Sequence, residues 1–244
     1  MDFIKLKMKA ETTNNVAAII VEPIQGTNGN VVPPAGFLNQ LRRLCDEIGA
    51  LLIVDEMITG FGRTGRLFAC QHDDVVPDII TIGKAVAGGV PMGAYGVTAE
   101  LGEQLDVARN VATGGTLFGN PLSAAAAKSA LTEVLVPAAY EHTSTLGGEL
   151  ADGIEAAIRS AGLPWTVIRL GPRSGQWYGP MPRTGAQAHA LTDGQLTRLM
   201  RVWLGNRGVW EALPGAGPTV PVPAARTDVT RYLEAYHDLL ARLG

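Results

Sequence analysis

Cysteine is scarce in this sequence: Cys45 and Cys70 are the two that occur among its 244 residues. Neither belongs to a Cys-x-x-Cys pair, so the pattern excludes a disulfide-stapled fold and a cysteine-based zinc site. The histidines are too widely separated to give metal-ligand spacing, at positions 72, 142, 189 and 237. We therefore predict reduced thiols in a cytoplasmic protein, with no metal site.

Long apolar runs are also missing. The longest fall far short of the roughly 20 residues that a membrane-spanning helix needs. The N-terminal sequence MDFIKLKMKAE has no continuous apolar stretch, so we expect no secretory signal and an irregular polar segment over residues 1–15. The net charge of −3 gives no bulk attraction to nucleic acid or anionic membranes. Apolar residues make up 46% and charged residues 18%, which is typical of a folded protein with a core.

The first half of the chain predicts a β-strand, a helix and a second strand. Residues 17–23 and 50–56 are short apolar runs, ended by a proline and by two carboxylates. Further strands are predicted at 78–83 and 93–98. The helix between the first two strands is expected to bury the face formed by Phe37, Leu41, Leu44 and Ile48. This order favours an α/β domain with a parallel sheet.

The second half has a different character. Residues 122–134 form an Ala-rich helical pattern that leads out of the sheet domain. Beyond it we predict a smaller α+β domain, which gives domains 1–135 and 136–244. Its expected elements are a helix at 138–161, strands at 165–171 and 174–180, a helix at 193–206, and a last helix opened by Thr227.

Lys84 differs from the other four lysines because it follows a predicted buried strand and is flanked by small residues. Burial disfavours the ammonium form, so such a lysine can act as a nucleophile toward an aldehyde. The alternative is a lysine that reaches from the strand end to solvent. Asp55 ends a run of five apolar residues, at the sheet edge where α/β proteins bind ligands. It could pair with a cationic ring nitrogen, or serve as a helix cap or in a loop salt bridge; Glu56 beside it is expected to make structural contacts.

A glycine-rich segment is the third candidate. Gly114, Gly115 and Thr116 could offer a phosphate backbone N–H groups and a hydroxyl, although a simple turn is the alternative. The Gly-Lys-Ser/Thr of a nucleotide-binding P-loop is absent from the sequence.

Four segments together resemble the signature blocks of class-III aminotransferases, a family that includes glutamate-1-semialdehyde aminomutases and ω-transaminases. They are VEPIQG (21–26), LLIVDEMITGFGRTG (51–65), PDIITIGKAVAGGVPMGAYG (77–96) and GGTLFGNPLS (114–123). The resemblance covers most of residues 17–135 and implies a pyridoxal-phosphate-dependent enzyme of fold type I. The expected reaction is amino-group transfer between an amine or amino acid and a carbonyl compound; intramolecular transfer, as in the aminomutases, is the alternative.

The resemblance also implies roles for single residues. Lys84 matches the lysine that forms the internal aldimine with the cofactor and then moves a proton. Asp55 matches the aspartate that keeps the pyridine nitrogen protonated, and Met57 falls where an aliphatic side chain packs on the ring. Thr116, with Gly115 beside it, matches a residue that reaches the cofactor phosphate of the neighbouring subunit, which implies a homodimer.

The chain departs from the family in length. It resembles only the C-terminal part, and the remainder of a family member normally carries the main phosphate-binding turn and the aromatic residue stacked on the ring. We therefore expect a complementary N-terminal polypeptide as an alternative partner, or a chain with no independent catalytic activity. A substrate-carboxylate arginine is not identified; Arg169, Arg183 and Arg226 are candidates by region, with surface roles as the alternative for each.

Overall fold

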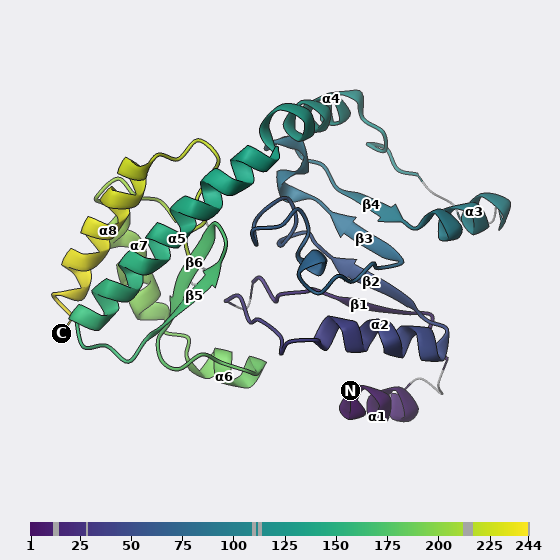
Figure 1. Cartoon of the computed structure of the whole chain (residues 1–244), viewed down its shortest axis with the longest axis horizontal. Helices are drawn as coiled ribbons and strands as arrows, with labels where there is room; N and C mark the ends of the chain where they lie inside the picture. Colours follow the sequence, from purple (N-terminus) through teal and green to yellow (C-terminus); the bar gives the residue numbers. More distant parts are fainter. Residues whose placement is uncertain (12–14, 28, 109–110, 112–113, 212–216, 244) are drawn as a thin grey trace. The chain divides into compact units, whose positions relative to one another are not determined.

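The computed structural model describes residues 1–11, 15–27, 29–108, 111, 114–211 and 217–243. The chain forms two compact units (Figure 1). The first unit consists of Met1–Pro23, Pro33–Phe61 and Phe68–Glu133, and the second of Ile24–Val32, Gly62–Leu67 and Val134–Gly244. Two short segments from the first half of the chain therefore belong to the second unit.

A four-stranded sheet with the order β1-β2-β3-β4 forms the centre of the first unit (Figure 1). Its strands are β1 (Ala18–Val21), β2 (Leu51–Asp55), β3 (Ile79–Ile82) and β4 (Ala94–Val97). The first three strands are parallel, as predicted, whereas β4 runs antiparallel to β3. A short connection joins β3 to β4, and a reversal of direction needs less chain than the crossover between parallel strands. The predicted α/β class is confirmed.

Helix α2 (Phe37–Ile48) covers one face of this sheet. Its side chains Leu38, Leu41 and Cys45 pack against Leu52 and Val54 of β2, which are both 0% exposed. The predicted helix is confirmed, and Leu41 and Leu44 of its expected face are buried. The buried stripe passes through Leu38 and Cys45, while Ile48 at the C-terminal end is 38% exposed.

The prediction of an irregular N-terminal segment was wrong, because residues Asp2–Glu11 form helix α1. Lys7 and Glu11 form an ion pair one turn apart, and Lys5 lies 3.0 Å from Glu47 of α2. Met1 and Ile4 pack against the apolar cluster of α2 and β2. A helix of this length is marginal in water on its own, so these tertiary contacts, which a local pattern does not show, decide its structure.

Short helices complete the first unit. They are the 3₁₀ turns η1 (Ala69–His72) and η2 (Lys84–Ala87), the helices α3 (Ala99–Ala108) and α4 (Pro121–Ser129), and the π-helical turn η3 (Ala130–Val134), which ends at the start of the second unit. Asn120 begins α4, where its side-chain oxygen accepts hydrogen bonds from the backbone N–H groups of Leu122 and Ser123.

The second unit is built around the long helix α5, which lies beside α8 in Figure 1. Its elements are α5 (Pro137–Ser160), β5 (Thr166–Leu170), β6 (Arg173–Trp177), α6 (Gly185–Ala190), α7 (Gly194–Gly205) and α8 (Arg226–Leu240). The strands form an antiparallel hairpin. Ile154, Leu204 and Tyr236, each 0% exposed, place the core between α5, α7 and α8. Within the described part of the chain, every helix is too short or too polar to cross a membrane.

Helix α5 approaches the β5–β6 turn closely at Gly147. A Cβ atom there would lie 2.3 Å from the carbonyl oxygen of Gly171 and 2.6 Å from Cα of Pro172, whereas a Cβ atom on Gly148 would meet nothing within 4 Å. We expect Gly147→Ala to lower the free energy of unfolding by about 2–3 kcal/mol, because backbone must move. Gly148→Ala should raise it by roughly 0.5–1 kcal/mol, because alanine favours a helix interior. Urea titrations followed by circular dichroism measure both, and similar shifts in the two variants would contradict this packing.

Candidate active site

Asp55 lies at the C-terminal end of β2, in register with Thr81 of the neighbouring strand β3. Its Oδ1 atom accepts a hydrogen bond of 3.0 Å from the backbone N–H of Met57. Among the described residues Asp55 forms no ion pair, and its Oδ2 atom accepts no hydrogen bond. The half-buried carboxylate is therefore neither in a loop salt bridge nor at a helix N-terminus, and one of its oxygens remains available to a cationic group.

Glu56 points to the opposite side of the sheet, as strand alternation requires. Its carboxylate is 0% exposed and accepts hydrogen bonds from the hydroxyl of Thr59 and, at 2.8 Å, from the backbone N–H of Cys70. Burial raises the pKa of the Cys70 thiol to about 12, and the negative charge of Glu56 adds to that shift. The predicted structural role of Glu56 is confirmed.

This buried carboxylate should matter for folding. We expect Glu56→Ala to lower the free energy of unfolding of the first unit by about 2–4 kcal/mol, because the N–H of Cys70 and the Thr59 hydroxyl lose their acceptor. Glu47→Ala is the matched control: Glu47 pairs with Lys5 on the surface, with a side chain 59% exposed, and its loss should cost less than about 1 kcal/mol. Chemical denaturation compares the two variants, and an equal cost would contradict the structural role.

Lys84 follows β3 and begins the turn η2. Its side chain is exposed, so of the two alternatives left open by the sequence, the described chain shows the lysine that reaches from the strand end to solvent. The backbone at Gly83, between β3 and the turn, is extended. Lys84 itself has φ of 50°, in the left-handed region where a long side chain costs about 1–3 kcal/mol. Strain of this kind is concentrated at functional sites.

The side chain of Met57 packs against the backbone immediately before Lys84. A Cβ atom on Gly83 would lie 2.5 Å from Cε and 2.7 Å from Sδ of Met57. Glycine at position 83 therefore lets Met57 lie directly on the strand end. The structure thus gathers three of the predicted residues, Asp55, Met57 and Lys84, at the C-terminal edge of β2 and β3.

Thr81 is a member of this cluster that the sequence analysis missed. Its Oγ1 atom is buried without a hydrogen-bond partner among the described residues. Because Thr81 pairs in register with Asp55 on a parallel strand, the two side chains share one face of the sheet. A hydroxyl among the isoleucines of IITI (79–82) is the signal that was available in the sequence.

Gly115 and Thr116, two of the predicted phosphate-binding residues, are not joined to this cluster by a hydrogen bond. Both are exposed, and neither forms a hydrogen bond with Asp55, Met57 or Lys84. Large apolar side chains around them are exposed as well, namely Val111 at 52%, Leu117 at 76%, Phe118 at 67% and Leu122 at 71%. An exposed apolar segment of this kind is typical of a surface that is covered by a partner.

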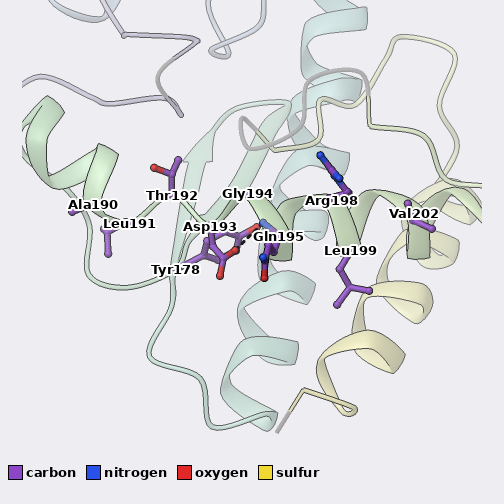
Figure 2. A pocket seen from close by; sticks show the side chains of 10 residues that line it. All are labelled: Tyr178, Ala190, Leu191, Thr192, Asp193, Gly194, Gln195, Arg198, Leu199 and Val202. Carbon is purple, nitrogen blue, oxygen red and sulfur yellow. Dashed lines mark hydrogen bonds between the residues drawn. The ribbon is translucent and has the colours of Figure 1, made fainter.

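A wide hollow of about 1020 Å³ in the second unit lies at the start of α7 (Figure 2). A helix N-terminus attracts anions through its free N–H groups, but here Asp193 accepts hydrogen bonds from the backbone N–H groups of Gln195 and Leu196. Its negative charge also opposes the entry of an anion. We assign no catalytic role to this hollow.

Of the three arginines proposed by region for a substrate carboxylate, Arg183 is exposed and the other two form surface ion pairs. Arg226 pairs with Glu149, while Arg169 pairs with both Asp152 and Glu155. The surface role expected for these two arginines is confirmed. In the second unit, Arg173 is buried and Arg63 is half-buried, and burial lowers the pKa of both guanidinium groups.

Comparison with known proteins identifies the family of this chain and the cofactor on which that family depends. Residues 3–171 match the class-III aminotransferase family. The chain belongs to this family. It is 42% identical over 184 residues to a glutamate-1-semialdehyde 2,1-aminomutase of Thermomicrobium roseum, covering 75% of this chain and 43% of that protein. The family depends on pyridoxal phosphate, so the predicted family and cofactor class are confirmed.

Solved structures give the same result for the fold. A glutamate-1-semialdehyde aminomutase from Pseudomonas aeruginosa PAO1 superposes with a TM-score of 0.88 at 28% identity, covering 99% of this chain and 55% of that one. A variant of the Pseudomonas protein has also been solved in complex with PMP. An (S)-enantioselective ω-transaminase from Thermomicrobium roseum has a TM-score of 0.81 at 29% identity, covering 98% of this chain and 54% of that one. Fold type I is therefore confirmed, and the chain spans about half the length of the relatives it matches.

Proposed function

We propose that this chain takes part in pyridoxal-phosphate-dependent transfer of an amino group between an amine or amino acid and a carbonyl compound. The observation that carries the proposal is the cluster at the end of β2 and β3. There, a carboxylate with a free oxygen, a thioether and a strained lysine lie at one edge of a parallel sheet. This is the edge where open α/β folds bind their ligands.

The side chains present suit the cofactor. Pyridoxal phosphate, when bound, supplies an aldehyde that takes up the amino group and a ring that accepts electrons from the substrate. Lys84 would hold the aldehyde carbon through its amine and would move a proton at the substrate Cα. The free oxygen of Asp55 would hold the proton on the ring nitrogen, because a carboxylate favours the protonated ring. Met57 would pack on one side of the ring.

We further propose that a second polypeptide completes the site. The sheet face that carries Asp55 also carries Ile20, 63% exposed, and Tyr95, 52% exposed, although parallel sheets are normally covered on both faces. The exposed segment around Thr116 supports a second copy of the chain, and the length of the relatives supports a complementary N-terminal polypeptide. A cytoplasmic location agrees with the free thiols of Cys45 and Cys70.

Intramolecular transfer is the second candidate function. It is favoured by the 42% identity to an aminomutase, whereas the ω-transaminase likeness supports transfer between two molecules. The two reactions use the same cofactor cluster, and they differ in whether the amino group leaves its original molecule.

Cofactor titration and two assays test the proposal. We expect the 244-residue chain alone to bind pyridoxal phosphate weakly, because each phosphate hydrogen bond that another polypeptide must supply is worth roughly 1.5–3 kcal/mol. Co-expression with the additional segment found in the relatives should give a yellow protein. That protein is then assayed with an amine and a carbonyl acceptor, and separately with glutamate-1-semialdehyde alone. A colourless co-expressed protein that is inactive in both assays would contradict the proposed function.

A further inference from the structure

A cavity of about 420 Å³ lies within the second unit, between α8 and the segments on either side of residues 212–216. It falls in the size range of small-molecule sites. Its lining residues belong to the second unit alone, and none of them is a member of the cofactor cluster described above.

Glu211 places a carboxylate in the wall of this cavity. Its Oε1 atom accepts a hydrogen bond of 2.7 Å from the hydroxyl of Tyr232, a residue that is 4% exposed. Among the described residues, Oε2 accepts no hydrogen bond and Glu211 forms no ion pair. Burial raises the pKa of Glu211, which Tyr232 and the charge of Arg201 counteract. A partly buried carboxylate with one unused oxygen is stabilised when a cation or a donor compensates it.

The rest of the wall is apolar and aromatic. Val220 and the rings of Trp210 and Tyr232 line the cavity. The guanidinium of Arg201 stacks over the ring of Trp210, 4.4 Å from its centroid, so this indole already stabilises one cation through its π-system. The remaining charges of the lining are the exposed Asp228 and Arg231, which have opposite signs and give the cavity mouth no net repulsion.

We propose that this cavity binds a small organic amine in its ammonium form. The ammonium group donates to Oε2 of Glu211, and the alkyl part packs against Val220 and the ring of Tyr232. An anion is disfavoured because Glu211 repels it. A neutral molecule of the same shape adds no positive charge beside Glu211, whose burial Tyr232 and Arg201 offset only in part, so the positive charge of the ligand is the decisive feature.

Calorimetric titration of the 244-residue chain tests this site with n-butylammonium chloride at constant ionic strength. We expect saturable binding with a dissociation constant on the order of 1 mM, as suits a ligand of so few atoms. Neutral n-butanol should bind at least about tenfold more weakly, because it keeps the alkyl group but lacks the charge. This comparison uses the unmodified chain and therefore does not depend on the folding of any variant.

Two variants locate the site. Glu211→Gln removes the charge with little change in shape and should weaken butylammonium binding by at least about tenfold. Glu234→Gln is the matched control: Glu234 is an exposed residue of α8 outside the cavity lining, and its removal should leave the affinity unchanged. The proposal is overturned by equal affinity for n-butanol, by unchanged binding in a folded Glu211→Gln variant, or by a titration of the unmodified chain that shows no saturable binding.

Discussion

Asp55→Asn should reduce the turnover of the active protein by about several hundred-fold, equivalent to roughly 3–4 kcal/mol of transition-state stabilisation. The carboxylate is the group at the cluster that can keep a proton on the cofactor ring nitrogen, and an amide of the same shape lacks the charge to do so. The fold should persist, because the hydrogen bond from the N–H of Met57 needs only an oxygen acceptor. Steady-state kinetics with a single amino donor measure the loss.

A second readout separates this chemical role from a structural one. The absorbance of the bound cofactor should change its dependence on pH in Asp55→Asn, since protonation of the ring nitrogen is no longer favoured. Asp74→Asn is the matched control: Asp74 is exposed with φ of 52°, a conformation that asparagine tolerates. We expect normal turnover for it. Near-normal turnover in Asp55→Asn would rule out the proposed contact with the ring.

Much of the first unit could be predicted from the sequence because strand periodicity is a local property. Two apolar runs that end at Pro23 and Asp55 are sufficient to place parallel strands on either side of a helix. The same alternation predicts that Asp55 and Glu56 point to opposite faces. The structure agrees, with Glu56 fully buried at Thr59 and Cys70.

What the sequence analysis missed depends on contacts between distant residues. Flanking small residues left both a buried and a solvent-exposed Lys84 open, because burial is set by which layer covers the strand end. In the described chain this side chain is exposed. The buried stripe of α2 differs from the expected face by including Leu38, because both Phe37 and Leu38 fit an apolar face and only packing on β2 decides which is fully buried. The close approach of Gly147 to Gly171 has no local signal at all.

For the cluster at the sheet edge, the sequence therefore predicted three of the residues. It did not predict how their side chains and backbone are arranged. Local context identified Asp55 and Lys84, and the family resemblance added Met57. The positive φ of Lys84 and the fit of Met57 onto Gly83 follow only from the turn after β3. Thr81 entered the cluster through strand register, which a single sequence does not reveal.

Lys84→Ala should abolish amino-group transfer, with a loss of about 10³-fold or more, since the residue provides both the covalent attachment and the proton transfer. The free energy of unfolding should change little, because the side chain is exposed and alanine retains the Cβ that strains the backbone at this φ. Lys128→Ala, on an exposed position of α4, is the control and should keep full activity. Borohydride treatment of the cofactor-bound protein, followed by peptide mapping, should place the reduced cofactor on Lys84. A label on Lys128 or on the lysines of α1 would show that the attachment site lies elsewhere.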